Sequence, residues 1–137
     1  MERAGAVHQF SPDDVVTSLL AFLPPVFNND PEKIHRTIKR LQQKKKYKEL
    51  LGGFDFLDQA RFPYSPLLAR VLNRLQESRL LSSRNPDYVV YEVKPESQAA
   101  IRSYFLDRGR VLSDYSETLN EIAKELNKEL TNIGAAK

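Results

Sequence analysis

The sequence predicts a mainly α-helical fold with one small β-hairpin, and two observations support this. Apolar residues recur at helical spacing along most of the chain, and helix-start signals precede each run. One helix, over residues 65–81, is followed after a short turn by residues 88–93, which are β-branched and aromatic and therefore typical of a strand. A helix that leads directly into a β-hairpin is the reading half of a winged helix-turn-helix. We predict that fold class, with further helices appended at the C-terminus.

The first half of the chain contains two clear helix starts. Ser11-Pro12 and Asp30-Pro31 each place a capping side chain before a proline at the first helical position. A proline pair ends the first helix, and we expect residues 26–30 to form a loop. The second helix is followed by a lysine run and a short third helical turn, which a glycine pair stops.

The central helix begins at Ser65-Pro66 by the same chemistry. Its apolar stripe is expected to face the core and consists of Leu68, Val71, Leu72 and Leu75. Residues 54–62, before it, are compatible with a short strand or with an extended segment that covers the core. Another helix starts at residues 94–95, and Ile101, Tyr104 and Phe105 are expected to face inward.

Positive charge is concentrated in the middle of the chain. The net charge is only +3, but residues 31–84 contain 13 lysines and arginines against 5 acids, an excess of eight. Such a concentration is typical of a protein that binds a polyanion. The alternative is a solvated, lysine-rich helix surface that keeps the protein soluble.

The outward face of helix 65–81 supplies the candidate base contacts. With the leucines buried, Arg70, Asn73 and Arg74 share one exposed stripe with Glu77. Arginine can bind guanine through two hydrogen bonds and asparagine can bind adenine in the same way. Small Ser65 would allow close approach to a groove. The alternative is an ordinary solvated face on which Glu77 pairs with the arginines.

Further basic residues are candidate phosphate contacts. They lie in the lysine run, on the helix before it and at the turn of the predicted wing, and they are Lys39, Arg40, Lys44, Lys45, Lys46 and Arg84. Each phosphate that they neutralise would release counterions and make binding dependent on salt.

The last helix, roughly residues 114–132, is predicted to pair two protomers. Apolar residues from position 112 onward are spaced three and four apart, as in a coiled-coil seam. The expected dimer contacts are Tyr115, Leu119, Ile122, Leu126 and Leu130. The alternative is that this helix packs back on its own domain.

Composition and motifs favour no catalytic or metal site. There is no cysteine, no glycine-rich phosphate loop and no nucleophile elbow. His8 and His35 are expected on the surface, away from metal-ligand partners. We therefore expect no enzyme, no catalytic residue, no metal and no cofactor. No apolar run is long enough for a membrane span, and we interpret the protein as cytoplasmic, without a signal peptide.

A stretch around the central helix resembles a known group. Phe54-Asp55-Phe56, then Phe62-Pro63-Tyr64-Ser65-Pro66-Leu67-Leu68, with later leucines at 72, 75, 80 and 81, resembles small prokaryotic winged-helix proteins of the YwgA-like and antitoxin-type regulator group. The resemblance covers residues 54–81. It implies a regulatory or toxin–antitoxin role and identifies no catalytic residue.

These observations lead to two functional hypotheses and one expected division of the chain. We expect a flexible arm over residues 1–10, a winged-helix domain over 11–93 and a helical extension over 94–137. The leading hypothesis is a prokaryotic transcriptional regulator that reads duplex DNA as a homodimer. The second is a winged-helix module that binds a protein partner, as an antitoxin or complex subunit does, without contacting DNA.

Overall fold

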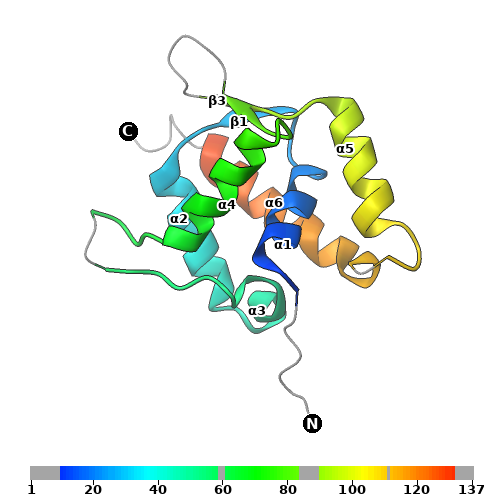
Figure 1. Ribbon diagram of the computed structural model, residues 1–137. Helices are drawn as coiled ribbons and strands as arrows, with labels where there is room; N and C mark the ends of the chain where they lie inside the picture. The colour runs from blue at the N-terminus through cyan, green and yellow to red at the C-terminus, as the bar shows by residue number, and fades with distance from the viewer. Residues whose placement is uncertain (1–9, 59–60, 84–89, 111, 132–137) are drawn as a thin grey trace.

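The computed structural model describes residues 10–58, 61–83, 90–110 and 112–131, and it is mainly α-helical with a small antiparallel sheet, as the sequence predicts (Figure 1). The α-helices are α1 (Pro12–Leu20), α2 (Pro31–Gln42), α3 (Lys45–Leu51), α4 (Pro66–Glu77), α5 (Pro95–Ile101) and α6 (Ser116–Thr131). The expected arm lies almost entirely outside the described residues.

The predicted helix starts are confirmed in α1 and α2. Ser11 Oγ accepts a hydrogen bond from the Asp14 N–H, and Asp30 Oδ1 accepts one from the Lys33 N–H. Each helix then opens with proline, whose missing N–H would have had no partner in the first turn. Helix α3 follows α2 after a short break at the lysine run, and residues 52–65 connect it to α4.

The sheet has three strands in the order β1-β3-β2, and they are β1 (Val26–Asn28), β2 (Ser82–Ser83) and β3 (Val90–Glu92). The expectation of a loop over residues 26–30 is wrong at its first three residues. They pair antiparallel with β3, and the Phe27 ring packs against Tyr91 with centroids 5.7 Å apart. The hydrogen-bond partners of this short strand lie on β3, far along the chain, so the local sequence of residues 26–28 does not indicate a strand. Residues 84–89, where the hairpin turn is expected, lie outside the described residues.

Helix α1 lies at the centre of the core. It packs against α4 on one side and α6 on the other (Figure 1). Val15, Leu19 and Leu20 of α1 are almost completely buried. The apolar face of α6 joins the same core, in contact with α1, α2 and β1. The C-terminal helix, which belongs to the expected helical extension over residues 94–137, is therefore part of this core.

Residues 54–58 and 61–64 form no regular strand. Leu57 and Tyr64 exchange backbone hydrogen bonds in an isolated bridge. The side chain of Gln42 donates to the carbonyls of Leu51 and Phe54, which ties the beginning of this segment to the end of α2. This arrangement fixes the position from which α4 begins.

Helix α5 continues into a π-helical turn over Arg102–Leu106, and this turn changes which side chains are buried. Ile101 is buried as expected, and Phe105 packs partly against the core. Tyr104 is exposed, so the expectation that it faces inward is wrong. A regular α-helix advances about 100° per residue, whereas the wider π turn advances less, so three residues do not return Tyr104 to the side of Ile101.

Candidate nucleic-acid interface

Helix α4 begins at a buried serine. Ser65 Oγ accepts a hydrogen bond from the Leu68 N–H at 3.1 Å, and Pro66 occupies the first helical position. Ser65 is completely buried. The prediction of Ser65 as a DNA contact is therefore wrong, because the residue is enclosed where it caps the helix.

His35 of α2 holds the same helix start from the neighbouring element. Its Nδ1 accepts a hydrogen bond from the Ser65 N–H at 3.0 Å, and its ring stacks on Tyr64 with centroids 4.9 Å apart. The expectation of a surface histidine is wrong here, because His35 lies among the aromatic side chains of residues 56–64. Burial lowers the pKa of His35 to about 4, so the imidazole is neutral at physiological pH.

The outward face of α4 carries Arg70 and Asn73. Leu68, Val71 and Leu75 are buried on the opposite side, as the spacing predicts, so Arg70 and Asn73 are exposed. Within the described part of the chain neither side chain has a hydrogen bond or ion pair. These two groups are available to a ligand without breaking any internal contact.

Arg74, the third predicted base contact, is engaged by the protein itself. Its Nε donates to Asp13 Oδ2 at 2.8 Å and its Nη2 donates to Asp13 Oδ1 at 2.6 Å, which joins α4 to the first turn of α1. Hydrogen bonds from Arg74 lower the pKa of the Asp13 carboxyl, and the same bonds raise the pKa of Arg74. A bidentate pair of this kind occupies the donors that base recognition would use.

The predicted phosphate contacts divide into paired and available groups. Three of them form ion pairs with carboxylates at N–O distances of 3.1 to 3.6 Å: Lys39 with Asp58, Arg40 with Glu125 and Glu129, and Lys46 with Glu121. Exposed pairs of this kind are weak, so a phosphate can compete for the cations, but the neighbouring acids reduce the local positive potential. Lys44 and Lys45 are exposed and have no such partner among the described residues. Arg84 lies outside the described residues.

Two cations that the sequence analysis did not single out lie beside the sheet. Arg79, just after α4, and Lys94, just after β3, line an open hollow of about 470 Å³ together with Gln76 and the two serines of β2. Among the described residues that line this hollow, none is acidic. Arg79 and Lys94 are far apart in the sequence, and only the pairing of β2 with β3 brings them together. In the sequence each of them is a single basic residue near the end of a predicted element, and nothing there indicates that the two lie close together.

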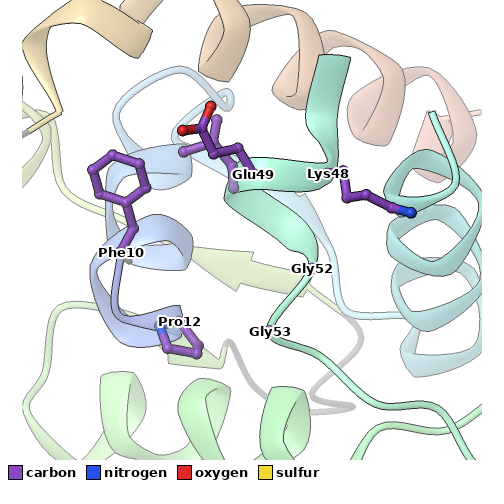
Figure 2. Close-up of a pocket in the computed structure, with 7 residues that line it drawn as sticks. Phe10, Pro12, Lys48, Glu49, Gly52 and Gly53 are labelled. Carbon is purple, nitrogen blue, oxygen red and sulfur yellow. The ribbon is translucent and has the colours of Figure 1, made fainter. Parts of the chain in front are cut away.

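A second hollow, near the helices, offers different chemistry. It measures about 550 Å³ and lies between the start of α1 and the end of α3 (Figure 2). Phe10, Lys48 and Glu49 line it, and the Lys48 and Glu49 side chains extend from α3 in different directions (Figure 2). Gly52 is the C-cap of α3 at the edge of this hollow. A Cβ at this position would lie 2.6 Å from the Lys48 carbonyl oxygen, so a larger residue would require a shift of the backbone. One carboxylate beside an aromatic ring provides no convergent set of acid, base and nucleophile.

The predicted dimer contacts lie inside the protomer. Leu119, Ile122, Leu126 and Leu130 are all buried in the core, where α6 packs on α1 and α2. Tyr115 is partly buried and packs edge-on against Phe10 at 4.9 Å. The structure thus agrees with the alternative that this helix packs on its own domain. A homodimer would need a surface other than this seam.

Comparison with known proteins identifies no relative of this chain, and the described residues form neither a metal-binding cluster nor a membrane-spanning helix. No protein-family model matches the chain, and neither do curated proteins or solved structures. Over the described ranges, no group of three or more histidines and carboxylates could hold a metal ion. In the same part of the chain, no helix combines the length and the apolar character needed to cross a membrane.

Proposed function

We propose that this chain is a winged-helix protein that binds duplex DNA through the outward face of α4, in the role of a transcriptional regulator. The observation that carries the proposal is the order of elements. Helix α1, strand β1 and helices α2 and α3 precede α4, and α4 is followed by the antiparallel strands β2 and β3. Strand β1 pairs with β3, which gives the sheet the order β1-β3-β2. Helix α3 and residues 52–65 are additional elements between α2 and α4.

Arg70 and Asn73 would make the base contacts. Both are exposed on one face of a helix whose other side is buried, so the helix can enter a major groove with its backbone held rigidly. Arg74 contributes only when its pair with Asp13 opens, which reduces the base-reading set relative to the sequence prediction.

Phosphates would be held on two sides of α4. Arg79 and Lys94 line a hollow beside strand β2 whose described lining residues include no acid, which suits a phosphate group. Lys44 and Lys45 are the further candidates at the start of α3. Each cation that contacts a phosphate adds about 0.9 to the slope of log affinity against log salt.

The test is selection from a pool of random duplexes, followed by a salt titration of the selected sequence. We expect one enriched motif for the wild type. Arg70→Ala should relax the preference at one base pair and weaken binding by about 1–3 kcal/mol. Lys94→Gln should weaken binding to all duplexes and lower the salt slope by about one.

Arg36→Ala is the matched control, because Arg36 is an exposed arginine of α2 whose side chain pairs with Glu32. It should leave the selected motif unchanged. Equal enrichment of unrelated duplexes by the wild type and by Arg70→Ala would contradict the proposal.

One observation favours the second candidate, a protein-binding module. A hollow of about 240 Å³ beside the first turn of α4 is lined by Leu57, Leu67 and Pro66, with Arg70 and Asp55 at the same hollow. Leu57 is 45% exposed, so the side chain of a partner could cover it. An apolar side chain followed by a carboxylate would suit this surface.

Leu57→Ser separates the two candidates. Under the DNA proposal this change leaves duplex affinity within about twofold, because Leu57 lies near Arg70 but offers no hydrogen bond to a base. Failure of the wild type to retain any duplex at low salt, together with a co-purifying protein that Leu57→Ser releases, would favour the protein-binding module.

A further inference from the structure

The segment that joins α5 to α6 presents an exposed aromatic ring beside arginines. Tyr104 is 65% exposed, the highest value among the large hydrophobic side chains identified as exposed in the described residues. The guanidinium carbon of Arg110 lies 5.8 Å from the centre of its ring. The Phe105 ring meets Tyr104 edge-on, with centroids 4.7 Å apart. Arg108 is exposed in the same short turn.

The turn is anchored to the core on both sides of Tyr104. The Asp107 N–H donates to the Arg102 carbonyl at 2.9 Å across the π turn, and the Leu112 N–H donates to the Phe105 carbonyl at 3.1 Å. The Arg102 side chain donates to the carbonyl of Ala21 at the end of α1. Because the backbone that carries Tyr104 is anchored, less conformational entropy is lost when a ligand stacks on its ring.

The charge around Tyr104 is positive. Arg108 and Arg110 make no ion pair with a carboxylate in the described part of the chain. One acidic residue, Asp107, lies in the sequence between the π turn and the two arginines. Its carboxylate accepts a hydrogen bond from the Ser103 hydroxyl at 3.4 Å. Gly109 has φ of +85° and allows the chain to turn between the two arginines.

We propose that Tyr104, Arg108 and Arg110 form a binding site for single-stranded nucleic acid. A base would stack on the Tyr104 ring, and the guanidinium groups would contact the adjoining phosphates. An acidic peptide without aromatic side chains would satisfy the arginines alone, whereas every nucleotide supplies both a phosphate and a flat base. The π turn supports a binding role, because such turns occur frequently at functional sites and here it is what turns Tyr104 outward.

This site is separate from the α4 surface. In Figure 1 the turn lies beyond the lower end of α5, on the other side of α1 from α4. The inference therefore does not depend on duplex binding by α4, and each can fail without the other.

Fluorescence anisotropy with two labelled oligomers tests the proposal. One is a short oligothymidine, and the other is an abasic oligomer of the same length that keeps the phosphates and lacks the bases. We expect tighter binding of oligothymidine. Tyr104→Ala should weaken oligothymidine binding by about 5- to 100-fold and leave the abasic oligomer unchanged, because only the stacking contact is removed. Arg110→Gln should weaken both.

Two controls make the result specific. Tyr104→Phe keeps the ring and should bind oligothymidine as the wild type does, whereas Arg36→Ala removes an exposed arginine of α2 that pairs with Glu32 and should also bind it normally. Equal affinity for the two oligomers, or no effect of Tyr104→Ala, would overturn the proposal. Displacement of oligothymidine by polyglutamate at equal charge concentration would also overturn it, in favour of an acidic peptide.

Discussion

Arg74 of α4 and Asp13 of α1 form a two-bond ion pair, with N–O distances of 2.6 and 2.8 Å. The pair joins the helix proposed to read DNA to the central helix of the core. It also neutralises one of the cations on the outward side of α4. Asp13 is therefore an internal competitor for any phosphate or base that approaches Arg74.

Asp13→Asn should increase duplex affinity, because Arg74 then becomes available to the nucleic acid. The salt slope should steepen by about 0.9, the value for one additional phosphate contact. Anisotropy titrations at several salt concentrations measure both quantities. Asp14→Asn is the matched control: it removes the same charge from the same turn but leaves the Arg74 pair in place. Equal effects of the two variants would show that only long-range charge matters.

Arg79→Gly should separate stability from binding. Arg79 has φ of +70°, a left-handed conformation that favours glycine, and it follows the C-cap of α4. We expect the free energy of unfolding to rise by up to about 1 kcal/mol, while the salt slope of duplex binding falls by about one. Urea melts and anisotropy measure the two effects. Arg79→Lys should keep the slope, and a slope unchanged in Arg79→Gly would remove Arg79 from the interface.

His35 should make stability fall in mild acid. Its pKa is about 4 in the folded protein against 6.5 in the unfolded chain, so the unfolded state binds the proton more tightly between these values. The stability is complete above pH 6.5 and declines as the pH falls toward 4. Between pH 7 and pH 5 the wild type should lose about 2 kcal/mol more than His35→Gln. Urea melts at both pH values test this, and parallel losses would contradict it.

Leu119→Ala should destabilise each protomer rather than dissociate a dimer. Leu119 is completely buried in the core, so its truncation should cost about 2–5 kcal/mol of unfolding free energy. Lys124→Ala, at an exposed position of the same helix, should change stability by less than about 0.5 kcal/mol. Melting temperatures measured over a range of protein concentrations distinguish the two cases, because a dimer seam would make the loss depend on concentration.

Local chemistry was sufficient to predict most helices. Capping by Ser11, Asp30 and Ser65, each followed by proline, gave the starts of α1, α2 and α4. The leucine spacing of α4 also gave its buried face. Strand β1 was missed because its partner β3 lies far along the chain, and no local signal announces such a pairing.

The candidate site was harder to predict, because it depends on contacts between distant residues. The spacing of α4 could not show that Arg74 pairs with Asp13, or that His35 encloses Ser65. The heptad-like spacing of α6 is the same for a dimer seam and for a core-facing stripe, so it could not distinguish them. The π turn that exposes Tyr104 could not be predicted either, because the spacing of apolar residues does not distinguish a π turn from a regular α-helix.

The most direct test of the account is to map amide chemical shifts during titration with the selected duplex. The account predicts that the largest shifts occur along the exposed face of α4 at Arg70 and Asn73, and beside the hairpin at Ser82 and Lys94. The amides of the buried Leu126 and its neighbours in α6 should stay in place. Shifts that leave α4 unmoved while the duplex binds elsewhere would contradict the assignment of α4 as the reading helix.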